Sequence, residues 1–175
     1  MTTKEKGGHQ LRSEEGVGSI MPASPRDPIV LLVQRNDDLD MYAEFLSHKG
    51  LTPLGASTAV DALAAAPRAD IIVTGILLDG EMNGIDLVTR LRADERTRQK
   101  PLIVLTAAVS RAQRERARQA GCDLFVPKPC LPEDLLRYVR LLLASSKRHH
   151  KRHAAKAHLF NTAAHRPKRQ RNRSA

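Results

Sequence analysis

The sequence predicts an α/β fold in which helices cover both faces of a parallel sheet. Short aliphatic runs without polar breaks, such as residues 29–33 and 102–106, are typical of strands buried on both faces. An amphipathic segment follows each run, and repeated strand–helix units of this kind form parallel sheets with right-handed crossovers. Aromatic residues are few and Trp is absent, so we expect an aliphatic core.

The first half of the domain contains two strand–helix units. The first strand is expected over residues 29–33, and Asp37 and Asp38 can cap the helix that follows. The apolar stripe of this helix is Leu39, Tyr42, Phe45 and Leu46, and Gly50 ends it. The second strand is expected over 51–55. A helix over 58–66 follows, capped by Thr58 and Asp61, and ends before Pro67.

The third unit, residues 70–84, contains the most informative stretch. Its strand, residues 71–74, leads through a turn-rich loop to Asn83 and Gly84, which begin a helix. The apolar positions of that helix are Ile85, Val88 and Leu91. In an open parallel sheet, ligands bind at the carboxyl ends of central strands. Here that position is occupied by Gly75, which has no side chain.

Two further units complete the fold. The fourth strand is expected over 102–106 and its helix over 110–120, capped by Ser110. The fifth strand covers 124–126 and ends at the Pro-Lys-Pro of residues 127–129. The apolar positions of the last helix are Leu135, Val139 and Leu142. This alternation predicts a flavodoxin-like, doubly wound five-stranded parallel sheet of order 2-1-3-4-5, with its site where strands 1 and 3 diverge.

Charge and composition divide the chain into three parts. The formal charge is +10, yet residues 147–175 hold ten Lys or Arg and no acid, which leaves 19 of the 29 basic residues against all 19 acids before that segment. We predict a disordered leader over 1–28, a folded domain over 29–146 and a disordered, His-rich basic tail over 147–175.

Several classes of protein are not supported by the sequence. No apolar run is long enough for a membrane span, and the first residues do not resemble a signal peptide. Cys122 and Cys130 lack disulfide or metal-site spacing, which indicates reduced thiols in a cytoplasmic protein. The tail histidines, His149, His150, His153, His158 and His165, have no Cys or acid to order a metal, so we expect no metal.

The landmarks together resemble the response-regulator receiver domain of two-component signalling over about residues 29–145. The motifs that carry the resemblance lie at 70–78 with 82–84, at 102–107, and at 120–123 leading to 127–129. The resemblance implies autocatalytic phosphoryl transfer to an aspartate that ends strand 3. It also implies Mg²⁺ held by an acidic pair after strand 1, and a hydroxyl and a lysine that contact the phosphoryl group.

Only half of those residues are present here. The matching ones are Thr106 for the hydroxyl, Lys128 for the lysine, Lys128-Pro129 for a dipeptide that is often cis, and Phe125 for the aromatic residue that reports the switch. The departures are Gln34 and Arg35 in place of the acidic pair, and Gly75 in place of the acceptor. The resemblance therefore indicates a pseudo-receiver without the acceptor aspartate. We expect it to bind neither Mg²⁺ nor another cofactor, because cations without facing carboxylates repel a metal ion.

Other assignments of the pocket stay open. Counting the loop back from Gly84 moves the acceptor to Ile76, which is also not an acid. Asp79 can stand in as the acceptor, and Asp37 or Asp38 can replace one metal ligand. Arg35, Lys128 and Thr106 can hold an anion. Alternatively, Arg35 turns to solvent or pairs with Asp37, Asp38, Asp79 or Glu81.

Two surfaces are candidates for binding a partner. Receivers commonly dimerise or dock through the face that here comprises helix 110–120, strand 124–126 and the last helix. Its arginines include Arg111, Arg114, Arg118 and Arg137, together with Arg116 and Arg140. The alternative is a solvated basic helix. The tail carries a second basic set, Lys147, Arg148, Lys151, Arg152, Lys168, Arg169, Arg171 and Arg173, which suits the phosphates of DNA or RNA.

These features lead to two main hypotheses and a weaker third. In the first, the chain is a receiver-like adaptor that acts without phosphorylation and meets a signalling partner or a second copy. In the second, it binds DNA or RNA non-specifically through the tail, although an acidic protein, a membrane surface or no partner at all also fits the tail. The third is a regulator phosphorylated on Asp79 or a small enzyme. No nucleophile–base pair or Gly-rich phosphate loop supports an enzyme, so we predict that the chain is not one.

Overall fold

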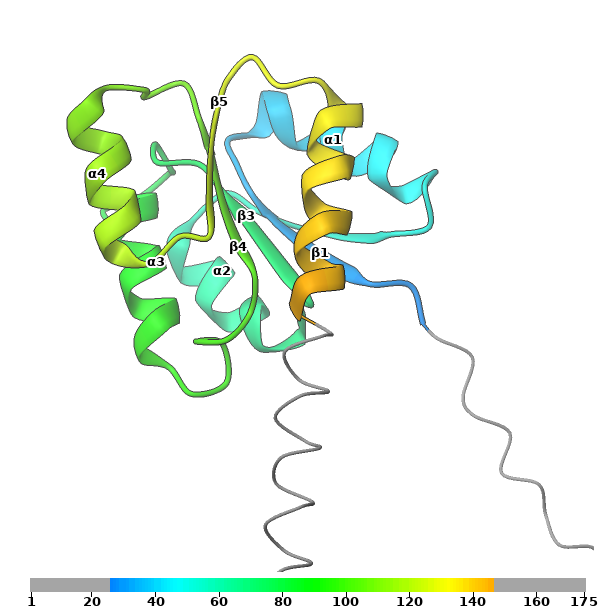
Figure 1. The fold of residues 1–175 in the computed structure, drawn as a ribbon, viewed down its shortest axis with the longest axis horizontal. Coiled ribbons are helices and arrows are strands. Elements are labelled where there is room, and N and C mark those ends of the chain that lie inside the picture. The colour runs from blue at the N-terminus through cyan, green and yellow to red at the C-terminus, as the bar shows by residue number, and fades with distance from the viewer. Residues whose placement is uncertain (1–25, 147–175) are drawn as a thin grey trace, which may run out of the picture.

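Five parallel strands lie side by side in the order β2-β1-β3-β4-β5 (Figure 1). The computed structural model describes residues 26–146, apart from the side chains of residues 36–38. The predicted basic tail and most of the predicted leader lie outside the described residues. The strands are β1 (Ile29–Val33), β2 (Thr52–Ala56), β3 (Ile71–Thr74), β4 (Leu102–Thr106) and β5 (Leu124–Pro127). The predicted fold class and strand order are confirmed.

Helices cover both faces of this sheet. They are α1 (Asn36–Ser47), α2 (Ala59–Ala65) with a 3₁₀ turn η1 (Ala66–Arg68), α3 (Gly84–Ala93), α4 (Arg111–Ala120) and a final helix over residues 132–146. Successive strand residues face opposite sides of a sheet. In β1, Leu31 and Val33 therefore pack with α2, α3 and α4, whereas Val30 and Leu32 pack with α1 and the final helix. No helix in the described part of the chain is long and apolar enough to cross a membrane.

Three predicted helix caps are present. The side-chain oxygen of Asn83 accepts hydrogen bonds from the first turn of α3, at 2.8 Å from Ile85 N and 3.1 Å from Asp86 N. Thr58 Oγ1 caps α2 by accepting from Asp61 N at 3.1 Å, and it donates to the Asp61 carboxylate at 2.7 Å. Ser110 accepts from the third residue of α4 at 3.2 Å. Each cap satisfies a backbone N–H that the helix itself leaves unpaired.

The predicted start of the first helix was wrong. The residue before α1 is Arg35, which has an extended backbone and makes no side-chain cap hydrogen bond. Asp37 and Asp38 therefore lie within the first turn and not at the cap. Carboxylates in a first turn still favour a helix, because they face the positive end of its dipole.

Smaller differences concern element ends. The second strand is displaced by one residue because Leu51 N donates to Leu46 O and so completes the turn after α1. The helical path continues past the predicted stop at Pro67, which lies in the first turn of η1, where a missing N–H costs little. In the final helix Leu143 is buried, whereas the predicted Leu142 is partly buried.

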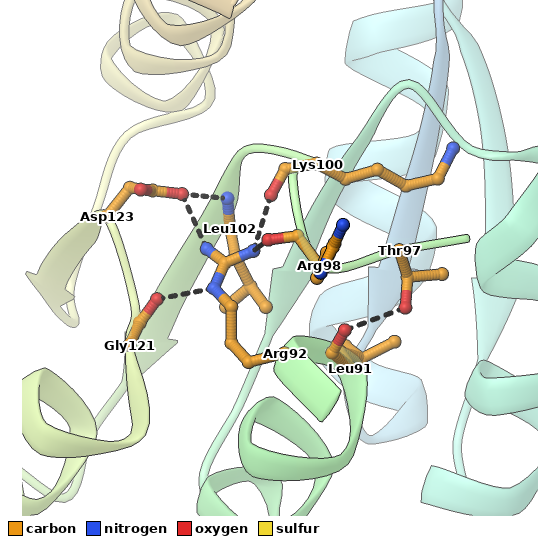
Figure 2. Close-up of polar contacts among 8 residues, drawn as sticks. All are labelled: Leu91, Arg92, Thr97, Arg98, Lys100, Leu102, Gly121 and Asp123. Atoms are coloured by element: carbon orange, nitrogen blue, oxygen red, sulfur yellow. Dashed lines mark hydrogen bonds and ion pairs between the residues drawn. The ribbon is translucent and has the colours of Figure 1, made fainter. Parts of the chain in front are cut away.

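The side chain of Arg92 ties three segments together at the amino end of β4 (Figure 2). Its Nε donates to Gly121 O at 2.7 Å, and its Nη1 donates to Arg98 O at 2.9 Å and Lys100 O at 2.8 Å. Its Nη2 pairs with Asp123 at 2.8 Å, and that carboxylate also accepts from the first N–H of β4 at 2.7 Å. The network joins α3, the loop before β4 and the loop before β5, and so fixes the end of the sheet opposite the predicted site.

Gly84 allows α3 to begin directly against the end of β3. Its N–H donates to Ile76 O at 2.8 Å. A Cβ atom at this position would lie 1.7 Å from Gly75 O, far inside van der Waals contact. The close approach of the two backbones therefore requires glycine at position 84 and places the strand 3 loop over the carboxyl edge of the sheet.

We predict that Gly84→Ala lowers the free energy of unfolding by roughly 3 kcal/mol, because the backbone must move to admit the methyl group. Urea unfolding of the full chain measures the loss. The matched control is Gly80→Ala: Gly80 has φ +88° and no atom within 4 Å of an added Cβ. That variant should lose only about 1–2 kcal/mol from its left-handed backbone. Equal losses in the two variants would contradict the close approach.

Candidate functional site

The predicted pocket residues meet at the carboxyl edge of the sheet, where β1, β3, β4 and β5 end. Val33, the last residue of β1, is in register with Thr74 at the end of β3, so Gln34 and Gly75 follow at adjacent strand ends. Thr106 ends β4 and is in register with Pro127 of β5. Four neighbouring strands thus direct the residues that follow them toward one place.

Gln34 occupies the centre of this edge. The residue is 2% exposed, and its Nε2 donates to Leu105 O at 3.3 Å. Its Oε1 accepts a hydrogen bond from Lys128 Nζ at 2.8 Å. A neutral amide thus supplies both a donor to β4 and an acceptor for the lysine that follows β5, so it satisfies two polar groups without adding charge.

Gly75 lies beside Gln34. Its N–H donates to Val33 O at 2.8 Å, which extends the pairing of β1 with β3 past the strand end. A Cβ atom on Gly75 would lie 3.2 Å from Gln34 Oε1, so the amide fills the space next to the glycine. The alternative position, Ile76, is 3% exposed and packs in the apolar core. Neither position carries a carboxylate.

Arg35 turns to the loop after β3. Its Nε lies 3.4 Å from a carboxylate oxygen of Asp79, and both side chains are largely exposed. Of the partners considered for Arg35 whose side chains are described, Asp79 is the one observed. The backbone of Asp79 is also fixed, since its N–H donates to Ser57 O at 3.1 Å. Such exposed ion pairs contribute little stability, but this one places a cation next to the alternative acceptor.

Thr106 is 3% exposed, and its hydroxyl oxygen accepts from Ala108 N at 3.1 Å. Its carbonyl accepts from Lys128 N at 2.9 Å, which places the loop after β5 against β4. The Lys128–Pro129 peptide bond is cis. The hydroxyl and the lysine that the resemblance singles out are therefore close neighbours, but each already makes contacts within the protein.

The aromatic position on β5 is covered by an arginine of α4. Phe125 is partly buried, and the guanidinium carbon of Arg114 lies 5.2 Å from its ring centroid. The other arginines of the predicted partner face differ in their contacts. Arg118 pairs with Glu115 and Arg137 with Asp134, each within its own helix at 2.7 Å. Arg111 makes no hydrogen bond or ion pair to the described residues.

Metal and thiol chemistry find no support among the described residues. Among the described side chains, those of residues 26–35 and 39–146, no group of three His, Cys, Asp or Glu could hold a metal ion. Cys122 and Cys130 are free thiols, and burial raises the pKa of both, so neither is an activated thiolate. The tail candidates for nucleic-acid binding, from Lys147 to Arg173, lie outside the described residues.

Residues 30–140 match the response regulator receiver domain model, and the chain belongs to that family. It is similar to the polar-differentiation response regulator DivK of Brucella anthropi, with 28% identity over 103 residues, which is 57% of this chain and 83% of DivK. The receiver domain of the sensor histidine kinase PA1611 from Pseudomonas aeruginosa is 26% identical. Its TM-score is 0.61, with 67% of this chain and 98% of that one covered.

A CheY-like receiver domain from Methanospirillum hungatei, at 22% identity and a TM-score of 0.64, shows the fold alone and covers 70% of this chain and 98% of that one. The PA1611 receiver was crystallised with a magnesium ion coordinated in its active-site cleft. The chain is therefore a response-regulator receiver domain of two-component signalling.

Sequence reasoning placed Gln34 and Lys128 in one pocket but missed their hydrogen bond. We predict a coupling free energy of roughly 1–2 kcal/mol between Gln34→Ala and Lys128→Ala in a double-mutant cycle of chemical unfolding, because the bond involves a charged donor. The control cycle pairs Lys128→Ala with Gln119→Ala on α4, and should couple by less than about 0.5 kcal/mol. Equal coupling in both cycles would refute the contribution of the bond.

Proposed function

We propose that this receiver works without phosphorylation, as an adaptor that presents a docking surface within two-component signalling. The observation that carries the proposal is the hydrogen bond of 2.8 Å between Lys128 and Gln34 at the edge of the sheet. Lys128 is the residue expected to contact a phosphoryl group, and here it contacts a neutral amide in the place of the acidic pair. Lys128 thus has a hydrogen-bond acceptor that the protein itself supplies.

We also propose that the chain lacks a phosphoacceptor. An acceptor must be a carboxylate within reach of the lysine and hydroxyl. The position beside them is Gly75, and its neighbour Ile76 is buried and apolar. Asp79, the remaining alternative, lies on the loop and pairs with Arg35 at 3.4 Å. Asp79 follows the expected acceptor position by four residues, so we propose that it does not serve as the acceptor.

The magnesium ion that the family implies does not fit these residues. Mg²⁺ prefers carboxylate oxygens in near-octahedral geometry. The positions of the acidic pair hold Gln34, whose side-chain oxygen accepts from Lys128 at 2.8 Å, and Arg35, a cation. A divalent cation here would displace that hydrogen bond and approach two positive side chains. We therefore assign no catalytic step and no cofactor to the chain.

The proposed docking surface is the face formed by α4, β5 and the final helix. Arg111, Arg114, Arg118 and Arg137 lie on it, and all four are exposed. A signalling protein or a second copy of the chain is the proposed partner. The reduced cysteines fit a cytoplasmic location, which is part of the same proposal.

We predict that the full chain stays unmodified after incubation with acetyl phosphate and Mg²⁺, as measured by intact mass under non-acidic conditions. The reason is that Gly75 occupies the expected acceptor position and Ile76 the alternative one, and neither carries a carboxylate. The Asp79→Asn variant is the matched control and should give the same unmodified mass. An adduct of one phosphoryl group on the natural chain that Asp79→Asn abolishes would identify Asp79 as the acceptor and overturn the proposal.

A second candidate function is supported by the tail. Residues 147–175 hold ten Lys or Arg and no acid, and such clusters bind nucleic-acid phosphates through counterion release. We propose non-specific binding of DNA or RNA through the residues named above, from Lys147 to Arg173.

We predict that Lys168→Gln combined with Arg169→Gln weakens binding of the full chain to a labelled DNA duplex. The slope of log affinity against log salt should become shallower by about 0.9 for each phosphate that the variant no longer neutralises. The control pair, Arg111→Gln with Arg116→Gln on α4, removes the same charge from the folded domain and should leave the slope unchanged. Two results would contradict binding of DNA through the tail. One is no binding at about 0.15 M salt, and the other is an equal change of slope in the tail variant and the α4 variant.

A further inference from the structure

Acidic and basic residues are separated across the folded domain, although its net charge is zero. Residues 26–86 contain ten acidic and four basic residues, whereas residues 87–146 contain six acidic and twelve basic ones. In the sheet order, β2 and β1 belong to the first group, and β4 and β5 belong to the second. The domain is thus a charge dipole, negative toward the β2 edge and positive toward the β5 edge.

The positive end of this dipole is concentrated on α4. The helix holds four arginines and one acid, and Ala117 is its one buried residue. Arg111 and Arg116 are exposed and make no ion pair to the described residues, and Arg118 pairs with Glu115 of the same helix at 2.7 Å. Arg114 covers Phe125. The outer surface of α4 therefore presents guanidinium groups whose charge the domain does not neutralise.

The negative end is concentrated on α1, whose sequence holds four acids and no base. Asp40 and Glu44 are exposed and make no ion pair to the described residues. Met41 lies between them in the sequence and is 46% exposed, which adds an apolar contact to the acidic surface. By length, α1 spans about 18 Å and α4 about 15 Å at ~1.5 Å per residue, so the two helices are of similar size.

The two helices cannot meet within one chain. α4 packs in the cluster on one face of the sheet, and α1 packs in the cluster on the other. In Figure 1 they lie at opposite sides of the molecule, with the sheet between them. A contact between these two helices therefore requires two molecules.

The choice of partner follows from the signs of the charges. A symmetric contact of α4 with α4 would place arginines against arginines, which is unfavourable for like charges. A nucleic acid would meet the arginines but would be repelled by the acidic half of the same domain. A second copy offers an acidic helix of matching size. Contacts of this kind, between different patches of identical chains, are heterologous and propagate head to tail.

We propose that the chain associates with itself head to tail, with α4 of one copy docked against α1 of the next. This inference rests on the part of the proposed function that makes the arginine-rich face a docking surface, and it identifies the partner as a second copy. Salt bridges from Arg111 and Arg116 to Asp40 and Glu44 of the next copy would carry the contact. Since exposed ion pairs are screened by salt, the association should be salt-dependent.

The test is sedimentation velocity of the full chain at increasing concentration. We expect oligomers at low salt and an apparent dissociation constant about tenfold weaker near 0.15 M salt. Two charge-reversed variants follow, one with Arg111→Glu and Arg116→Glu, the other with Asp40→Lys and Glu44→Lys. Each should be monomeric alone, because it lacks one half of the contact.

An equimolar mixture of the two variants should associate again, because both pairings of α4 with α1 between unlike copies join opposite charges. The first variant keeps a natural α1 and the second keeps a natural α4, so one contact between them remains intact, and its formation shows that both variants are folded. The control variant, Arg68→Glu with Arg98→Glu, reverses two exposed arginines outside α4 and should associate as the natural chain does.

Three outcomes would overturn the inference. They are a natural chain that is monomeric at low salt, an α4 variant that still associates through another segment such as the tail, and variants that fail to pair when mixed. The phosphorylation result is separate from these. If the chain accepts a phosphoryl group and still assembles, the head-to-tail contact stands and the phosphorylation-independent function is overturned. If the chain stays unmodified and monomeric, the proposed function stands and the head-to-tail contact is overturned.

Discussion

The hydrogen bond between Lys128 and Gln34 is the contact on which the account of this receiver depends. It joins the residue after β1 to the residue after β5, which are separated in the sheet by β3 and β4. Gln34 is buried and neutral, so the acceptor that it offers the lysine is an amide oxygen. A receiver that exchanges phosphoryl groups needs a lysine that can meet a new anion. Here the lysine already has an acceptor, the side-chain oxygen of Gln34. Gly75 has no side chain, so no Cβ atom crowds that oxygen from its side.

The rest of the fold holds this edge in place. Gly84 permits α3 to start against the backbone of Gly75, and Asn83 caps that start. The loop that carries Asp79 therefore ends at a fixed position. At the other end of the sheet, Arg92 joins the segments before β4 and β5 through four hydrogen bonds and so fixes where both strands begin. The chain thus has the architecture of a receiver, and Gln34 and Lys128 are joined by a hydrogen bond at the carboxyl edge of its sheet.

Local sequence signals predicted most of the fold but only part of the site. Buried strands such as Leu102–Thr106 and caps such as Asn83 are encoded by neighbouring residues, and these predictions were confirmed. The predicted start of α1 was wrong. Asp is a residue type that often caps helices, which favoured Asp37 and Asp38, but the residue at the cap is Arg35. The bond between Lys128 and Gln34 joins residues 94 positions apart and had no local signal. The sequence left several possible partners open for Arg35. Asp79 is one of them, and the folded loop places it beside Arg35.

We propose that the hydrogen bond between Gln34 and Lys128 persists in the presence of phosphoryl analogues. The most direct test is a backbone amide NMR spectrum of the full chain before and after addition of Mg²⁺ with beryllofluoride, an analogue of a phosphoryl group on an aspartate. We predict that the signals of Gly75, Thr106 and Lys128 do not move, since the expected acceptor position is a glycine and cannot hold the analogue. Saturable shifts of these signals, with changes spreading to Phe125 and α4, would contradict it.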